Sequence, residues 1–195
     1  MSPAFGLCTG DFDGDGNEDI FLAQNFFAVQ PETPRYDAGR GLLLKGDGSG
    51  RFLAVPGQES GIRVYGQQRG AAVGDFDGDG RLDLAVTQNG GETKLYRNAR
   101  ARPGLRLKLR GPSHNPDGFG AVVRLKFGDG WGPAREVHGG GGYWSQDSLV
   151  QVMGTPTAPS EVLVRWPGGQ TTTNAVPAKA REIQVWFEGK LEVIR

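Results

Sequence analysis

The chain of 195 residues lacks the features that mark several protein classes. Its single cysteine, Cys8, cannot form an internal disulfide, so a disulfide-stapled fold is excluded. No apolar run approaches the roughly 18 residues of a transmembrane helix, and the first residues carry no signal-peptide features. Neither charge sign dominates, because 22 Lys and Arg residues balance 22 Asp and Glu residues. We therefore expect no membrane span, no signal peptide in this chain and no nucleic-acid partner, which would need a basic surface.

Helical periodicity is missing from the first half of the sequence, whereas glycine is abundant at 33 residues and 12 prolines punctuate the chain. Short runs of Val, Leu, Ile and Phe lie between glycine-rich turns, a composition typical of all-β proteins. The strands expected in this half lie at residues 20–23, 42–45, 51–55, 71–73 and 84–87.

Two segments of the chain are closely similar, which indicates an internal repeat. Residues 9–23 read TGDFDGDGNEDIFLA and residues 73–87 read VGDFDGDGRLDLAVT, an offset of 64. A weaker similarity relates LLLKG at 42–46 to KLYRN at 94–98, and an insertion at 30–39 lengthens the first copy. Each repeat is therefore expected to be a small antiparallel sheet with an acidic loop between two of its strands.

Each acidic loop carries aspartates at positions 1, 3, 5 and 9 of a nine-residue segment. Four carboxylates this close repel each other unless a cation lies among them, and oxygen ligands at this density suit Ca²⁺. Position 7 would offer its backbone carbonyl, since an arginine side chain has no acceptor, and glycine at position 6 permits a sharp turn. The candidate ligands of the two calcium sites are Asp11, Asp13, Asp15, Asn17 and Asp19 in the first loop and Asp75, Asp77, Asp79, Arg81 and Asp83 in the second.

Other interpretations of these loops are less favoured. An EF-hand needs Glu at position 12 and flanking helices, but Leu22 and Val86 stand there and the flanks are strand-like. Hairpin turns would explain the Asp-Gly pairs but not aspartate at four matched positions in both copies. Magnesium keeps its waters and uses fewer protein ligands than calcium does. Calcium is therefore the expected cofactor.

The pattern D-F-D-G-D-G-x-x-D before a short apolar strand resembles the FG-GAP/VCBS repeat, the calcium-binding blade repeat of integrin α-subunit β-propellers and many bacterial secreted proteins. The resemblance covers roughly residues 5–98, and both copies match at every ligand position. It implies that each loop lies between adjacent strands of one propeller blade. Two blades cannot close a ring, so it also implies a C-terminal fragment of a parent chain with further blades, or an abbreviated relative.

The second half has a different strand pattern. Residues 105–110 and 121–127 alternate apolar and basic residues, which is typical of half-buried antiparallel strands. With further strands expected at 161–166, 182–187 and 191–194, the pattern predicts a small antiparallel β-sandwich or barrel-like domain. The expected division is two blade repeats at residues 1–100 and this β domain at residues 101–195.

Three segments of the second half resemble the ASPIC/UnbV domain, which follows FG-GAP repeats in the cartilage acidic protein family. They read NPDGFGAVVR at 115–124, REVHGGGGYWSQ at 135–146 and VLVRWPGG at 162–169. The resemblance covers about residues 104–187, and the order of the two parts is the same as in that family. It implies no well-established catalytic activity.

The glycine run at 139–142 precedes Tyr143 and Trp144 and lacks the Lys-Ser/Thr of a phosphate-binding loop. Close strand packing or a wide bend is the favoured interpretation. The aromatic side chains of the second half could stack on sugar rings, although such residues more often pack in small β domains. Among them, Trp131 in a glycine-rich turn is the best candidate for exposure.

Catalytic chemistry finds little support. Ser145, His138 and Asp147 have the residue types of a hydrolase triad, but no nucleophile-elbow pattern accompanies them. The clustered aspartates are better explained as metal ligands than as glycosidase carboxylates. We therefore predict no catalytic residues and a protein that is not an enzyme.

Together, these patterns favour a non-enzymatic, calcium-stabilised binding or adhesion module with a protein or glycan partner. The alternative is a carbohydrate-binding or accessory domain of a larger secreted enzyme. Extracellular calcium modules have Kd values of roughly 10⁻⁴–10⁻³ M, which cytosolic calcium is too low to fill. We therefore expect an extracellular or periplasmic location.

Overall fold

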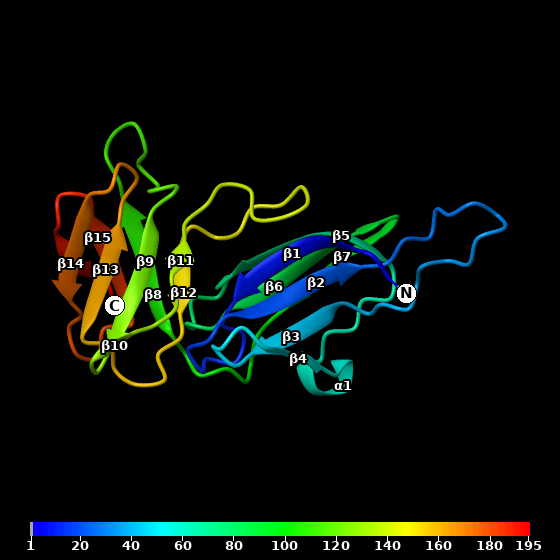
Figure 1. Cartoon of the computed structure of the whole chain (residues 1–195), viewed down its shortest axis with the longest axis horizontal. Coiled ribbons are helices and arrows are strands. Elements are labelled where there is room, and N and C mark those ends of the chain that lie inside the picture. Colours follow the sequence, from blue (N-terminus) through cyan, green and yellow to red (C-terminus); the bar gives the residue numbers. More distant parts are fainter. Residues whose placement is uncertain (1) are drawn as a thin grey trace.

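The computed structural model describes residues 2–195, and almost all of its regular structure is β. Figure 1 shows an elongated molecule with a pair of small sheets toward one end and a two-sheet sandwich at the other. The expected all-β fold, with blade-type repeats followed by a small β-sandwich, is confirmed.

The first half forms two blade-like antiparallel sheets. Blade 1 has the strand order β1-β2-β3-β4 and blade 2 the order β5-β6-β7. Their bounds are β1 Ala4–Gly10, β2 Asp19–Gln24, β3 Leu42–Gly46, β4 Phe52–Val55, β5 Gln67–Gly74, β6 Asp83–Asn89 and β7 Gly91–Tyr96. One short helix, α1 (Gly57–Ser60), connects the blades. In the described residues no helix is long and apolar enough to cross a membrane.

The strand register establishes that the blades are true structural repeats. Leu7 pairs with Leu22 in blade 1, and Ala71 pairs with Val86 in blade 2, both at the 64-residue offset. Each first strand also has a register shift at the matching place, just before Leu7 and just before Ala71. The third strands correspond at an offset of 52, because Ile20 faces Leu44 whereas Leu84 faces Tyr96. The insertion at 30–39 accounts for ten of the 12 additional residues between the second and third strands of blade 1.

The blades pack face to face around an apolar core. Blade 1 contributes Cys8, Phe21 and Ala23, and blade 2 contributes the face that carries Leu84 and Val86. All five side chains are at most 2% exposed. Alternation along each strand places every second side chain in this core, so each blade keeps an opposite face directed away from its neighbour.

The second half is a sandwich of two sheets. One has the order β10-β9-β13-β14 with β11 paired to β9, and the other has the order β12-β8-β15-β16. Their bounds are β8 Leu105–Arg110, β9 Val122–Phe127, β10 Gly130–Trp131, β11 Arg135–Glu136, β12 Gln151–Met153, β13 Glu161–Arg165, β14 Thr171–Ala175, β15 Glu182–Trp186 and β16 Leu191–Val193. Alternating residues such as Leu107, Val123, Val162 and Ile183 are fully buried between the sheets. The pair β8–β15 is parallel, whereas the sequence pattern predicted antiparallel pairing throughout.

Strand β12 connects the two cores. Val152 belongs to the blade core, while the next residue, Met153, belongs to the sandwich core. The two side chains point to opposite faces because successive strand residues alternate. Both are 3% exposed, so the junction between the halves is well packed.

Replacing Val152 with Ala should lower the free energy of unfolding by roughly 2 kcal/mol, because it leaves a cavity in the blade core. Amide hydrogen exchange should then accelerate in β6 of blade 2 more than in β13 of the sandwich. Val193→Ala, at a 45% exposed position in β16, is the matched control and should change stability little. Equal destabilisation by both variants, or faster exchange confined to β13, would contradict this role of Val152.

Candidate metal centres

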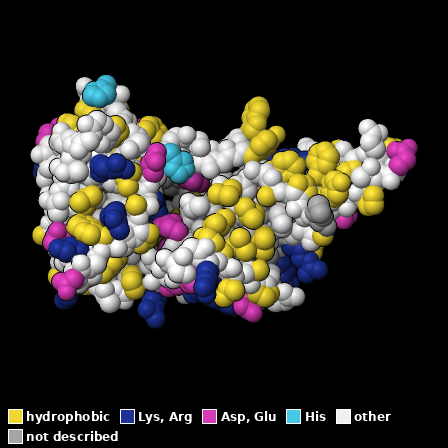
Figure 2. All heavy atoms as spheres, viewed as in Figure 1, with side chains coloured by type: hydrophobic (Ala, Val, Ile, Leu, Met, Phe, Trp, Pro, Cys, Tyr) yellow, Lys and Arg dark blue, Asp and Glu magenta, His cyan; other side chains and the backbone are white. Residues whose placement is uncertain are grey.

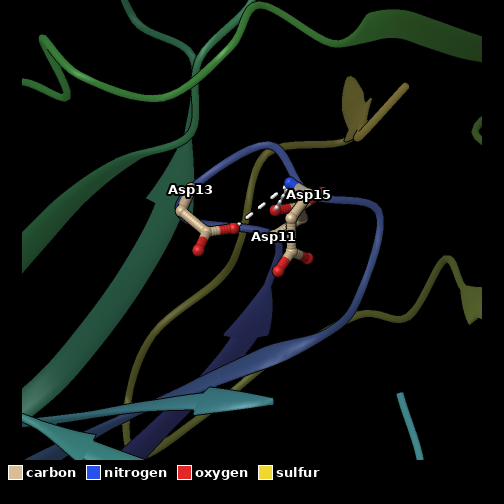
Figure 3. Close-up of side chains that lie close together, drawn as sticks. All are labelled: Asp11, Asp13 and Asp15. Atoms are coloured by element: carbon tan, nitrogen blue, oxygen red, sulfur yellow. Dashed lines mark hydrogen bonds between the residues drawn. The ribbon is translucent and has the colours of Figure 1, made fainter. Parts of the chain in front are cut away.

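Loop 1, residues 11–19, connects β1 to β2 and gathers three carboxylates. One oxygen from each of Asp11, Asp13 and Asp15 lies within 4.8 Å of the other two (Figure 3). Asp11 Oδ1 accepts hydrogen bonds from the N–H groups of Gly14 (2.6 Å) and Asp15 (3.1 Å), and its Oδ2 accepts one from Gly16 (2.7 Å). Gly14 and Gly16 have φ angles of +76° and +92°, which a residue with a Cβ resists. The loop is therefore wound around the Asp11 carboxylate.

The aspartate at position 9 of each loop ties the loop to the third strand of its blade. Asp19 Oδ1 accepts from Gly46 N–H at 2.9 Å and its Oδ2 from Phe12 N–H at 2.8 Å. In the second repeat, Asp83 accepts from Asn98 N–H at 2.7 Å and from Phe76 N–H at 3.1 Å. Both side chains are buried because they close the blade at the base of the loop.

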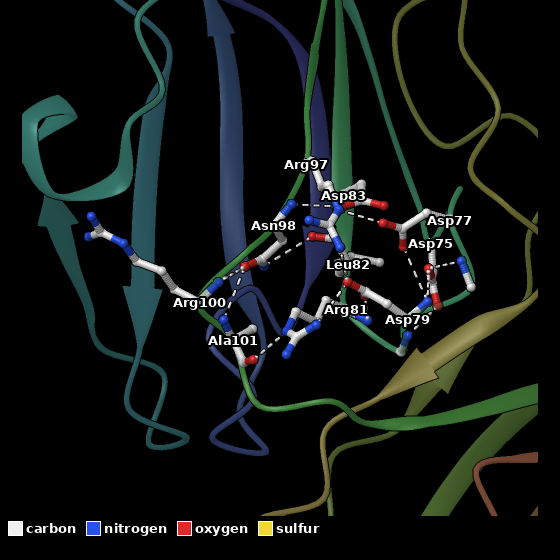
Figure 4. Close-up of polar contacts among 12 residues, drawn as sticks. Asp75, Asp77, Asp79, Arg81, Leu82, Asp83, Arg97, Asn98, Arg100 and Ala101 are labelled. Atoms are coloured by element: carbon white, nitrogen blue, oxygen red, sulfur yellow. Dashed lines mark hydrogen bonds and ion pairs between the residues drawn. The ribbon is translucent and has the colours of Figure 1, made fainter.

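Loop 2, residues 75–83, has the same backbone pattern but different charge partners. Its three close carboxylates are those of Asp75, Asp77 and Asp83. Asp79 is instead bonded to Arg81 Nη1 at 2.8 Å and to Arg97 Nη2 at 3.0 Å (Figure 4). The structure thus brings positions 1, 3 and 5 together in loop 1 and positions 1, 3 and 9 in loop 2.

Burial disfavours the charged form of several of these carboxylates. It raises the pKa of Asp19 to about 6 and also raises the pKa values of Asp11 and Asp83, with further upward contributions from neighbouring aspartates. Asp77 shows the opposite effect, because its hydrogen bond with Arg97 lowers its pKa. A bound cation would favour the ionised form of every carboxylate that it contacts.

The donor set of each loop is compatible with a calcium ion. Calcium binds oxygens at about 2.3–2.6 Å, so two oxygens on one ion lie up to about 5 Å apart, and the clustered carboxylate oxygens lie within that span. Asp11, Asp13 and Asp15 would hold the ion in loop 1, and Asp75, Asp77 and Asp83 in loop 2. The backbone carbonyls of Asn17 and Arg81 remain predicted ligands, while the Arg81 side chain bonds Asp79 and Ala101 O (2.7 Å).

Both loops lie at the junction with the sandwich. Arg106 of β8 pairs with Asp75, whose side chain has no solvent exposure, and also with Glu182 at 3.0 Å. Arg135 of β11 pairs with Glu18 of loop 1. Neither arginine was among the residues predicted from the sequence, since Arg106 is one of several basic residues alternating along β8 and carries no local signal of its role.

Comparison with protein-family models agrees with this architecture. An FG-GAP-like repeat matches residues 11–86, and the ASPIC and UnbV model matches residues 111–189. The chain combines FG-GAP-like repeats with an ASPIC/UnbV domain. A search of curated proteins finds no match. The family resemblance inferred from the two acidic loops and the glycine-rich segments is thereby confirmed.

The ASPIC/UnbV loop around residues 138–148 runs back to the blades (Figure 1). Asp147 Oδ1 accepts from Val73 N–H at 2.9 Å, and Ser148 N–H donates to Val73 O at 2.8 Å, so this loop extends the free edge of β5. Asp147 is thus engaged by backbone, and His138 contacts Glu136 O. A Cβ at Gly142 would lie 3.2 Å from Leu7 O, a close backbone approach that explains one glycine of the run.

The aromatic side chains differ from expectation in their exposure. Trp144 is 92% exposed. Trp131 is only half-buried and lines a cleft of about 610 Å³ between loop 1 and the sandwich. Trp166 is buried at 2% and donates to Thr172. The prediction that Trp131 would be the most exposed of these aromatic residues was therefore wrong. Trp144 is more exposed because the turn at 142–145 directs its side chain outward.

Gly154→Ala should destabilise the junction by about 1–3 kcal/mol, the usual cost of overpacking. A Cβ at Gly154 would overlap Asp11 Oδ2 and lie 3.0 Å from Gly16 N, while Asp11 is 4% exposed and fixed by backbone hydrogen bonds. Chemical denaturation measures the effect. Gly130→Ala is the control, since the nearest atom to its Cβ is Phe127 O at 3.8 Å. A Gly154 variant as stable as the control would show that loop 1 adjusts freely.

Proposed function

We propose that this protein is a non-enzymatic, calcium-stabilised binding module that works outside the cytoplasm and presents a surface to a protein or glycan partner. The single observation that carries the proposal is the duplicated carboxylate cluster, in which three aspartates of each loop converge within 4.8 Å. Hard oxygen donors in this arrangement fit calcium better than other common metals.

Calcium would act here as a structural ion. Each loop connects two strands of its blade and also contacts the ASPIC/UnbV domain, through Glu18–Arg135 in loop 1 and Asp75–Arg106 in loop 2. An ion bound among the carboxylates would fix the loop and, through it, the relative position of the two halves. This role needs calcium at extracellular concentrations, which supports an extracellular or periplasmic location.

A further propeller blade is the proposed neighbour of blade 1. The face of blade 2 that carries Ala71, Leu84 and Val86 is buried against blade 1. The equivalent face of blade 1, with Leu7, Ile20 and Leu22 at the 64-residue offset, is open, and Leu7 is 44% exposed. Figure 2 shows hydrophobic side chains gathered over this part of the molecule. The packing of blade 2 on blade 1 is the model for how another blade would cover this face.

The proposed binding surface is an aromatic patch formed by Phe5, Phe26, Arg69, Tyr143 and Trp144. Arg69 lies 4.1 Å from the centroid of the Phe5 ring, and the Phe5 and Tyr143 ring centroids are 6.0 Å apart. Trp144 has a φ angle of +53°, unusual for a residue with a side chain. Backbone strain that places a large aromatic in solvent suggests a binding role. Such a platform also supports the second candidate function, a carbohydrate-binding or accessory domain of a larger secreted enzyme.

Calcium titration of metal-stripped protein should give two bound ions. At a Kd of about 0.1 mM and about 2 mM free calcium, each site would add roughly 1.8 kcal/mol to stability. Chelation should therefore lower the melting temperature by several degrees. Asp13→Asn and Asp77→Asn should each remove or weaken one site, while Asp129→Asn, at an exposed acid outside both loops, should leave both. A stoichiometry of zero in millimolar calcium would refute the calcium role.

Trp144→Gly should raise stability by up to about 1 kcal/mol, because glycine adopts positive φ without strain, and should abolish binding of a partner that uses the aromatic patch. A glycan array and thermal melting measure the two effects, with Leu53→Gly as an exposed apolar control at a distance (75% exposed). Unchanged glycan binding by the Trp144 variant would exclude the patch as the glycan site.

A further inference from the structure

We propose that Lys45 and Arg97 are built-in counter-cations that hold the acidic loops in the absence of metal and compete with calcium for the same carboxylates. This inference rests on the proposed calcium binding. It assigns a role to two side chains outside the acidic motif. The calcium affinity of each blade would then depend on a residue at the end of its third strand as well as on its loop.

The two side chains occupy equivalent positions in the two repeats. Leu43 faces Phe21 in blade 1, and Leu95 faces Ala85 in blade 2, so the third strands correspond at an offset of 52. Lys45 and Arg97 follow two residues later and are related by the same offset. The next residue in each case, Gly46 or Asn98, donates its N–H to the position-9 aspartate. The end of each third strand is thus fixed against its loop.

The contacts made by the two cations also correspond. Lys45 Nζ pairs with Asp13 Oδ2 and lies 3.0 Å from Asp15 Oδ2. Arg97 Nε lies 2.5 Å from Asp77 Oδ2, and its Nη2 lies 3.0 Å from Asp79 Oδ2. In both repeats, one basic side chain bridges the aspartates at positions 3 and 5. The position-3 aspartate belongs to the proposed ion site of both loops, and the position-5 aspartate belongs to that of loop 1.

Displacement of either side chain is possible without unfolding. The side chains of Lys45 and Arg97 are 47% and 55% exposed. Both line a cavity of about 490 Å³ between the blades, which gives the released charge a place near solvent. Because exposed ion pairs are weak, a divalent ion can exchange for either cation. The exchange replaces the single positive charge of the side chain by the double charge of the calcium ion. The ion is also coordinated directly by several oxygen atoms, which a lysine or arginine side chain is not.

The two loops should differ in calcium affinity, because different basic side chains pair with their aspartates. In loop 1 no Lys or Arg among the described residues pairs with Asp11, which accepts only backbone N–H groups. In loop 2, Arg106 pairs with the buried Asp75 and Arg81 adds a second guanidinium on Asp79. In the described residues, three arginines therefore pair with aspartates of loop 2, whereas Lys45 alone pairs with aspartates of loop 1. We expect calcium to bind loop 1 more tightly.

Calcium titration calorimetry on the full chain tests this inference with the variants Lys45→Met and Arg97→Met. Methionine retains much of the apolar stem and removes the charge. Lys94→Met, which removes a cation of β7 that pairs with Glu92 instead, is the matched control. Each site is measured alone by placing Lys45→Met in an Asp77→Asn background and Arg97→Met in an Asp13→Asn background. Melting in chelator gives the stability of each metal-free variant.

Each charge removal should lower the calcium Kd of its own loop by about three- to tenfold, as expected for losing an exposed competing ion pair. The metal-free melting temperature should fall, and added calcium should restore it. Lys45→Arg and Arg97→Lys, which keep the charge, should stay within about twofold of wild type. Wild-type loop 1 should also bind more tightly than wild-type loop 2.

The outcomes separate this inference from the proposed function. If wild type binds calcium but the Met variants bind it equally or less tightly, the counter-cation role is wrong and the calcium role stands. If the wild-type protein shows no calcium binding and a Met variant does bind calcium, the competition is real, and Lys45 and Arg97 prevent calcium binding in the wild-type loops. If no variant binds, both proposals fail.

Discussion

Neutralisation of eight aspartates in two short loops is the constraint on which the rest of this structure depends. Two kinds of group stabilise the negative charge of the aspartates in each loop. Backbone N–H groups bond the carboxylates at positions 1 and 9, as at Asp11 and Asp19. A basic side chain at the end of the third strand bridges positions 3 and 5. The observed conformation of each loop therefore depends on contacts from the third strand of its blade.

The same carboxylates join the two halves of the chain. The side chain of Asp75 is completely buried where it pairs with Arg106 of the sandwich, and removal of one partner from such a buried pair leaves an uncompensated charge. Close packing reinforces the junction, because Gly154 lies directly against Asp11 and Val152 inserts into the blade core. The FG-GAP repeats and the ASPIC/UnbV domain have separate cores, yet their contact surface is built from the loops proposed to bind metal. A metal ion bound in these loops would therefore be physically coupled to the arrangement of the two domains.

Local patterns were sufficient for most of the secondary structure. The apolar–basic alternation at residues 105–110 predicted β8 with its observed bounds, and the repeat offset predicted equivalent strands in the two blades. The parallel pairing of β8 with β15 was missed, because alternation indicates which face is buried and says nothing about strand direction. The exposure of Trp144 was missed as well, since it depends on a tight turn closed by the bridge between Gly142 and Ser145.

The sequence alone determined the two acidic loops, because aspartate spacing and glycine at positions of positive φ are local requirements. It also determined the family, since those same local motifs carry the resemblance. The tertiary structure decided which basic side chains pair with the aspartates of the loops. Lys45 is 32 residues beyond its partner Asp13, and Arg106 is 31 residues beyond its partner Asp75, so neither contact could be read from spacing. Side chains this far apart in the chain come together only when strands pair and sheets pack, because the contact free energy depends on geometry set by the whole fold.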